Sequence, residues 1–297
     1  MAGPSLSYQF KTANIVVKLI VINVLVWIGF MLLEWMLNSG SILSHWFSLP
    51  TDLGRLIIQP WSLLTYAFLH AGFWHIFWNM LILYWFGQIV LNLFTEKRFL
   101  TIYLLGALSG GVLFVLAYNL FPVLITSSAY LVGASAAVRA IMIFIAAYTP
   151  NTEVRVIFFN VKLWHIGVFV VLTDLIQIPS SGNAGGLLAH VGGAIFGYVY
   201  AQQLGKGNDI GLWWERLADN FVGLFKAKPK AAKKAKMKTV YKNKTTSERT
   251  SYRSRPSMSK NEKQIKVDAI LDKISKSGYD SLSKDEKDFL FKAGKEN

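Results

Sequence analysis

Four polar side chains of this sequence lie in apolar surroundings and together have the composition of a hydrolytic site. Ser135 lies in the small-residue segment LVGASAAVRA, His75 and Asn79 lie four residues apart in one apolar stretch, and His190 lies in another. A histidine next to a serine hydroxyl can act as general base and then as general acid, which is the chemistry of acyl transfer. Imidazole and amide N–H groups, with the serine backbone N–H, can stabilise the oxyanion that forms.

These residue types predict a role for each member of the group. Ser135 is the candidate nucleophile, His190 the general base, and His75 with Asn79 the oxyanion hole. No carboxylate is convincingly placed beside His190, because Asp174, near the outer end of the predicted fifth helix, is a poor candidate. The sequence therefore predicts a Ser–His dyad rather than a triad.

Helical spacing explains how separate segments can bring these side chains together. His75 and Asn79 are four residues apart and share a helix face, as do His190, Gly193 and Gly197. Glycines on that second face let a neighbouring backbone approach closely. Counted from the starts of three predicted membrane-spanning helices, Asn79, Ser135 and His190 fall within one outer layer of a bilayer, roughly 4–9 Å deep.

Composition indicates a membrane domain followed by an aqueous tail. The chain is 53% hydrophobic and 16% charged, and residues 206–297 carry +11 of its net charge of +14. Soluble domains contain about a quarter charged residues, so the apolar first 205 residues fit a bilayer better than water. There is no cysteine, which excludes a disulfide framework and a thiolate metal site, and we expect no cofactor.

Six stretches reach the length of about 20 mostly apolar residues that a spanning helix needs. They are 15–37, 73–94, 99–119, 133–149, 161–178 and 184–204. The first is too long for the core of a cleavable signal peptide. The sequence thus predicts an all-α polytopic membrane protein, with a six-helix domain over residues 1–205.

Lysine and arginine in the short connections give the orientation. With the N-terminus inside, the inner connections carry six of them besides the basic tail, and the outer connections carry only Arg55. Both termini are therefore predicted to be cytoplasmic. The long first outer loop, about 38–72, is rich in aromatic residues, so it either lies in the outer interface or forms a small cap packed on the helices.

The tail divides into two predicted parts, 206–261 and 262–297. The first begins with LWWERLADNFVGLF, whose spacing predicts an amphipathic helix on the inner membrane surface. Seven lysines follow between residues 226 and 238, and they favour anionic lipid headgroups over nucleic acid, because no aromatic residues interleave with them. Residues 239–261 have the composition of a disordered linker.

The last part, 262–297, is predicted to be a small helical hairpin. Its first helix stops at Gly278, and its second starts with a capping box from Ser283 to Glu286. Two short helices cannot build an independent core, so we expect the hairpin to dock on an unidentified partner or to be only marginally ordered.

Three motifs together resemble one known family. The segment FLHAGFWHIFWNMLILYWFG resembles the second helix of rhomboid intramembrane serine proteases, GASA their nucleophile segment, and AHVGGAIFG their sixth helix. Order, spacing and helix count match the bacterial six-helix type over about residues 15–205. The resemblance implies an endopeptidase of the bacterial cytoplasmic membrane that cuts transmembrane segments entering laterally near the fifth helix and the long loop. It also implies the roles given above for Ser135, His190, His75 and Asn79, and suggests that His70 helps to shape the site.

The chain departs from the family pattern at two positions. Ala136 follows the serine where the family most often has glycine, so its methyl group is either tolerated or crowds the site. Arg139 stands where an aromatic or apolar residue is common. We expect Arg139 to turn away toward interior water or a carbonyl, without electrical contact with His190, because a bare cation there would oppose the imidazolium that forms.

Alternative functions explain fewer of these residues together. Taken singly, the serine, the histidines and the glycines could each be packing residues of a membrane bundle. A catalytically inactive rhomboid-like protein that binds membrane helices is the principal alternative. A channel or transporter would need charges through the bilayer or an internal repeat, and a membrane metalloprotease would need a motif such as H-E-x-x-H; the sequence has neither.

Overall fold

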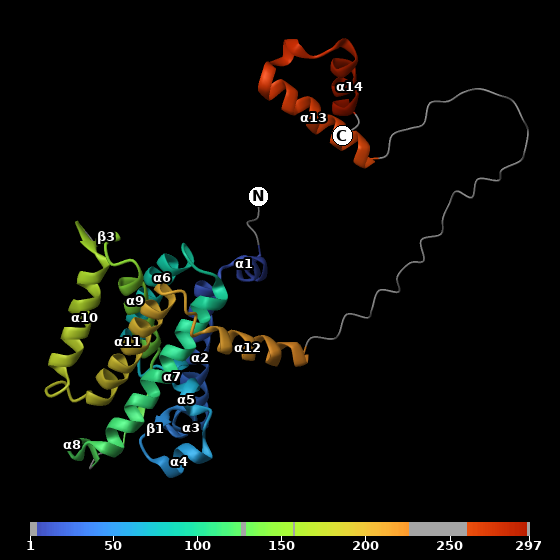
Figure 1. Cartoon of the computed structure of the whole chain (residues 1–297). Helices are drawn as coiled ribbons and strands as arrows, with labels where there is room; N and C mark the ends of the chain where they lie inside the picture. The colour runs from blue at the N-terminus through green and yellow to red at the C-terminus, as the bar shows by residue number, and fades with distance from the viewer. Residues whose placement is uncertain (1–4, 126–128, 157, 226–259, 296–297) are drawn as a thin grey trace, which may run out of the picture. The chain divides into compact units, whose positions relative to one another are not determined.

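The structure of the chain, a computed structural model, describes residues 5–125, 129–156, 158–225 and 260–295. Contacts divide the chain into two units, Met1–Pro229 and Lys230–Asn297. Figure 1 shows the first unit as a bundle of helices and the second as a short helix pair. The predicted lysine run from 226 to 238 and almost all of the predicted linker lie outside the described residues.

Four helices of the first unit are long and apolar enough to cross a membrane. They are α2 (Ile15–Leu37), α6 (Phe73–Leu91), α7 (Glu96–Leu120) and α11 (Ala184–Gly205). Two shorter apolar helices, α9 (Ser135–Tyr148) and α10 (Leu163–Gln177), coincide with the fourth and fifth predicted spans. All six predicted segments are therefore helical, and the crossing of a bilayer by α9 and α10 stays a prediction.

Side-chain caps account for the sharp starts of three of these helices. Asn14 accepts a hydrogen bond from the Val17 backbone at the start of α2, and Thr95 does the same for Arg98 at the start of α7. At the start of α11, Asn183 accepts from the Gly186 backbone at 3.2 Å. Each cap satisfies a backbone N–H that has no partner within its helix.

Shorter elements join the long helices. Before α6 the chain forms α1 (Leu6–Thr12), α3 (Ile42–Phe47), β1 (Leu49–Pro50), α4 (Leu53–Ile58), α5 (Ser62–Thr65) and the 3-10 helix η1 (Tyr66–Phe68). After α7 it forms α8 (Pro122–Ile125), β2 (Tyr130–Leu131), β3 (Glu153–Val156) and β4 (Phe159–Lys162).

The hairpin of β3 and β4 is a feature that the sequence analysis did not predict. The two strands pair antiparallel between α9 and α10, with Val154 opposite Val161. The start of the fifth helix, expected at 161, consequently moves to Leu163. The signal was weak because four-residue strands are short compared with the window of about 20 residues in which a span is recognised.

The long loop from about 38 to 72 packs onto the bundle as a cap. Its strand β1 pairs with β2, so Leu49 lies opposite Leu131. Tyr66 is fully buried; its hydroxyl donates to the Ala107 carbonyl at 2.7 Å, and its carbonyl accepts from the Gly133 backbone at 2.9 Å. Figure 1 shows α3, α4 and β1 gathered at one end of the bundle. The loop therefore holds the segment that leads into Ser135.

Three helices, α7, α9 and α11, make the closest contacts of the bundle. A Cβ atom on Gly193 of α11 would lie 2.0 Å from the Ala136 carbonyl oxygen of α9, and one on Gly197 would lie 2.3 Å from the Ala140 oxygen. Such distances mean that the two backbones touch directly, which only glycine allows. The predicted glycine face of the sixth helix is thus confirmed as the contact with the fourth.

After α11 the chain forms α12 (Leu212–Phe225), the helix predicted from LWWERLADNFVGLF. Trp213, Leu217 and Phe221 are exposed on it, consistent with an amphipathic helix. Asp219 joins α12 to α7 through an ion pair with Lys97 at 2.7 Å. Attachment of α12 to a membrane surface stays a prediction.

The second unit contains α13 (Lys260–Ser277), the 3-10 helix η2 (Tyr279–Ser281) and α14 (Lys284–Lys295). The first helix ends before Gly278, whose φ is +78°, as predicted. The predicted capping box is confirmed, because the Ser283 backbone donates to Glu286 Oε2 at 2.8 Å and the Glu286 backbone donates to Ser283 Oγ at 3.3 Å. Among the described residues of the second unit, the buried apolar side chains are those of Ile270 and Leu282.

We predict that Gly193→Ala destabilises the bundle strongly, because its methyl group would overlap the Ala136 carbonyl. Overpacking typically costs about 1–3 kcal/mol, and contact with a backbone leaves less room for relief than contact with a side chain. Gly29→Ala in α2 is the matched control, since a Cβ atom there has no neighbour within 4 Å. Thermal unfolding in detergent measures both variants, and equal midpoints would contradict the close approach of α11 to α9.

Candidate active site

The four residues predicted to do chemistry converge on one cavity of about 650 Å³. His75 and Asn79 of α6, Ser135 of α9 and His190 of α11 all line it. These residues are separated by up to 115 positions in the chain, so tertiary packing brings them together. The rest of the lining includes the aromatic side chains Trp74, Trp78, Phe114, Tyr118 and Tyr130.

Ser135 is the first residue of α9 and is directed by the turn before it. Gly133 has φ of +124°, a conformation that residues with a side chain rarely adopt. A Cβ atom on Gly133 would lie 2.7 Å from Nε2 of His75 and 3.6 Å from Oγ of Ser135. The imidazole of His75 and the hydroxyl of Ser135 therefore face the same small space beside Gly133.

The hydrogen bonds of His75 and Asn79 leave donors available to the cavity. The Ala71 backbone N–H donates to His75 Nδ1 at 3.3 Å. A neutral imidazole that accepts at Nδ1 carries its proton on Nε2, so the ring presents an N–H toward Gly133 and Ser135. Asn79 is buried and donates from Nδ2 to the His75 carbonyl at 2.8 Å, which fixes its side chain on the same helix face.

His70, which the family resemblance places near the site, contacts His75 directly. The two imidazole rings lie edge to face with centroids 5.2 Å apart. Burial lowers the pKa of His70 to about 3, with the neighbouring His75 as a second cause. His70 is therefore a neutral packing partner of His75 at ordinary pH.

The expectation that no carboxylate lies beside His190 is wrong. Asp174 of α10 is 4% exposed, and its Oδ1 lies 3.2 Å from His190 Nδ1. From the sequence alone, Asp174 near the outer end of the predicted fifth helix is a poor candidate. The close packing of α10 on α9 and α11 at this end brings the carboxylate within hydrogen-bonding distance.

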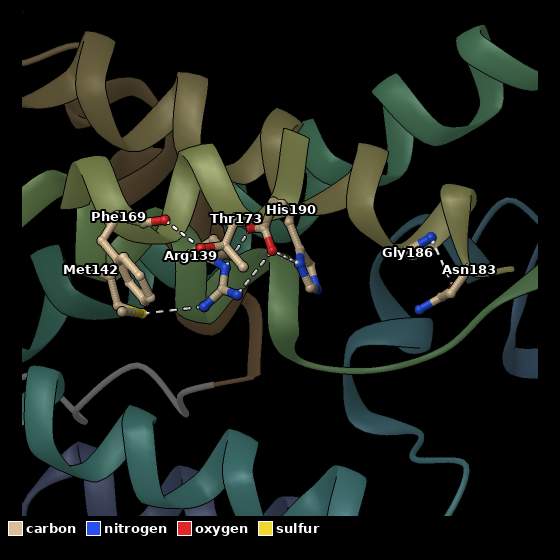
Figure 2. Close-up of polar contacts among 8 residues, drawn as sticks. Arg139, Met142, Phe169, Thr173, Asn183, Gly186 and His190 are labelled. Atoms are coloured by element: carbon tan, nitrogen blue, oxygen red, sulfur yellow. Dashed lines mark hydrogen bonds and ion pairs between the residues drawn. The ribbon is translucent and has the colours of Figure 1, made fainter. Parts of the chain in front are cut away.

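The expectation that Arg139 turns away from the site is also wrong. Its Nε donates to Asp174 Oδ2 at 2.8 Å and its Nη2 donates to Asp174 Oδ1 at 3.1 Å, so the two side chains form a bidentate ion pair. In Figure 2, dashed lines run from the side chains of Arg139 and His190 to the same carboxylate, which is that of Asp174. The physical reason is that a largely buried guanidinium needs an anionic partner, and a carboxylate satisfies it better than a carbonyl.

Asp174 is rejected from the sequence as a partner of His190, although the sequence contains a signal in its favour. An arginine inside an apolar helix needs a partner, and Asp174 is an acidic residue inside another predicted span. Pairing the two would have placed the carboxylate next to the face that carries Ser135.

The methyl group of Ala136, the other departure from the family pattern, does not crowd the cavity. Ala136 is buried, and its Cβ lies 2.5 Å from the position that a Cβ on Gly110 of α7 would occupy. The methyl group therefore fills space that Gly110 leaves open between α9 and α7.

Comparison with known proteins points to one family for the bundle. A model of the rhomboid domain matches residues 58–207, about half of the chain. Residues 254–293, in the tail, match a model described as a family of unknown function, DUF6576.

Two curated relatives carry the same family name. RHOMBOID-like protein 12, mitochondrial, from Arabidopsis thaliana is 31% identical over 157 residues, which are 49% of this chain and 47% of the relative. Rhomboid-like protease 1 from Toxoplasma gondii is 25% identical over 177 residues, 58% of this chain and 57% of the relative. The chain thus spans about half the length of the curated relatives it matches.

The depressed pKa of His70 generates a prediction about acid stability. Unfolding returns the pKa from about 3 to its ordinary 6.5, so the unfolded chain binds a proton that the folded chain does not. The stability contributed by neutral His70 is complete above pH 6.5 and falls as the pH drops from 6.5 toward 3, by about 1.4 kcal/mol per unit. His70→Phe, which keeps a ring without a titrating group, should flatten this part of the pH profile.

Thermal unfolding midpoints of the two proteins between pH 7.5 and 5 provide the measurement. The wild type should lose more stability than the variant over this range. Identical slopes would show that His70 does not stay neutral in the folded protein.

Proposed function

The chain belongs to the rhomboid family, and from this premise we propose that it is an intramembrane serine protease that cleaves transmembrane segments of other proteins. The observation that carries the proposal is the convergence of Ser135, His190, His75 and Asn79 on one cavity. Each comes from an apolar helix. A polar side chain in such a helix costs free energy, so its presence there indicates a function.

In the proposed reaction, Ser135 Oγ attacks the carbonyl carbon of the scissile peptide bond. His190 accepts the hydroxyl proton at Nε2 and then donates it to the leaving amine nitrogen, so the peptide C–N bond breaks and an acyl-enzyme remains. A water molecule attacks the acyl carbon and gives its proton to the same nitrogen. The released Ser135 oxygen takes that proton back, which restores the starting state.

The oxyanion of the tetrahedral intermediate needs hydrogen-bond donors that are already in place. His75 Nε2–H is suited to this role, because Nδ1 is occupied by the Ala71 N–H and the ring lies beside the same Gly133 turn as Ser135. Asn79 on the same face and the backbone N–H of Ser135 at the start of α9 are further donors. Fixed donors of this kind act before the negative charge develops, so no reorganisation is needed.

The surroundings of the cavity fit an apolar polypeptide as substrate. Trp74, Trp78, Phe114 and Tyr118 line it together with the polar groups, and α10 has few buried residues. We propose that a substrate helix approaches laterally near α10 and the 38–72 cap and unwinds locally to reach Ser135.

The proposal also covers the topology and location of the chain. It includes six membrane spans with both termini in the cytoplasm, a bacterial cytoplasmic membrane as the location, and contacts of the basic tail with anionic lipid headgroups.

The decisive experiment compares the purified wild type with Ser135→Ala on a model transmembrane substrate in detergent. We expect cleavage by the wild type and none by the variant, with both proteins unfolding at the same temperature. Substrate that binds to the folded wild type but is never cut would instead favour an inactive rhomboid-like protein that binds membrane helices.

We predict that Asn79→Ala lowers kcat without raising KM, because its amide acts on the oxyanion and not on the bound substrate. Loss of one oxyanion donor typically costs about 10²–10³ in rate. Asn23→Ala is a matched control, since Asn23 is also buried and donates to the carbonyl four residues before it, at 2.9 Å, in α2.

Measurement of kcat and KM per folded molecule distinguishes the two variants. Asn23→Ala should change stability and leave kcat close to that of the wild type. Equal losses of kcat in both variants would assign Asn79 a structural role.

A further inference from the structure

We propose that Asp174 is a positioning residue that orients His190 as a base, and that Arg139 in turn holds Asp174 in place. The inference rests on the proposed function and deepens it by adding a third and a fourth member to the Ser135–His190 pair. It concerns this chain's own ion pair, at the position where the chain departs from the family pattern.

The geometry fixes which nitrogen of His190 can accept the serine proton. Asp174 Oδ1 lies 3.2 Å from His190 Nδ1, and both oxygens of the carboxylate accept hydrogen bonds from Arg139. A carboxylate only accepts, so Nδ1 must be the donor and carry the ring proton. The lone pair is then on Nε2, the nitrogen that the proposed reaction needs free for the Ser135 hydroxyl.

Arg139 has a distinct part in this arrangement. Its Nε and Nη2 donate to the two oxygens of Asp174, in the planar geometry that guanidinium and carboxylate share. These two hydrogen bonds fix the orientation of the carboxylate. The opposite charges also compensate each other, so His190 faces a neutral pair rather than a bare cation. A single arginine beside the base would oppose formation of the imidazolium, whereas the paired arginine does not.

The position of Asp174 links the base to helix α10. Only Leu163, Gly167 and Asp174 of α10 are buried, and Asp174 is the one near its C-terminal end. The orientation of His190 therefore depends on this end of α10 being docked against α9 and α11. The imidazole of His190 is therefore oriented as a base only while α10 is packed against α9 and α11.

Variants of the full chain can separate positioning from packing. Asp174→Asn alone would leave Arg139 as an unpaired cation, so each Asp174 change is combined with Arg139→Met. The double variant with Asp174→Asn keeps an oxygen that can accept from Nδ1, and the double variant with Asp174→Leu keeps none. With a model transmembrane substrate in detergent, we expect kcat to fall in the order wild type, Asn double variant, Leu double variant, with KM unchanged.

The expected loss for the Leu double variant is about 10²-fold or more in kcat per folded molecule, the scale of a misplaced general base. The matched control is Arg98→Met combined with Asp209→Leu. Asp209 also pairs with an arginine, at 2.5 Å, and also accepts from a third side chain, Tyr200, at 2.7 Å, but none of the three lines the cavity. This control should keep the kcat of the wild type.

A second measurement determines the tautomer of His190 in the wild type directly. Nitrogen-15 NMR of the histidine-labelled chain at neutral pH, with the His190 signal identified by its loss in His190→Gln, reports which ring nitrogen carries the proton. We expect a protonated Nδ1 and an unprotonated Nε2.

The outcomes separate this inference from the proposed function. Cleavage that depends on Ser135 but persists at the wild-type kcat in the Leu double variant would overturn the positioning role and leave the protease intact. A proton on Nε2 of His190 would overturn it as well. Absence of any Ser135-dependent cleavage by the wild type would overturn the proposed function, and the inference with it.

Discussion

The direct contact of two helix backbones is the constraint on which the site depends. Gly193 and Gly197 of α11 lie against the carbonyls of Ala136 and Ala140 of α9, with no room for a single added carbon atom. Because His190 precedes Gly193 by three residues and Ser135 precedes Ala136 by one, this contact also brings the base toward the nucleophile. In a membrane, where apolar surfaces gain little by meeting each other, such close packing is a main source of helix association.

Two other parts of the chain, the 38–72 cap and α10, also position the site. The 38–72 cap pairs β1 with β2 and binds Gly133 through Tyr66, which sets the turn before Ser135. Helix α10 contributes Asp174, which bonds both Arg139 and His190. The nucleophile is thus positioned through a loop and the base through a neighbouring helix, so the two halves of the proposed chemistry are supported independently.

Arg139 shows how a charge can be retained inside an apolar bundle. An unpaired guanidinium would be expensive there, and one that faced the base alone would disfavour the imidazolium. Pairing with Asp174 resolves both problems, because the pair is neutral as a whole and still offers His190 a carboxylate oxygen. A residue that departs from the family pattern is therefore accommodated by a partner on another helix.

The sequence by itself determined the helices and the chemistry they carry. Long apolar stretches and the spacing of His75 with Asn79 and of His190 with Gly193 depend on local order along the chain, and local order is what a sequence displays. The same holds for the capping box of Ser283 and Glu286 in the tail. Residue types alone also indicated which groups could act as nucleophile, base and oxyanion donors.

Only the tertiary structure decided what lies beside each of these groups. The choice of Asp174 as the partner of His190 and Arg139 and the fit of the Ala136 methyl group against Gly110 both depend on contacts between segments distant in the chain. Spacing along one helix gives the face on which a side chain lies. It does not give the distance to a neighbouring helix, and hydrogen bonds and ion pairs change over fractions of an ångström.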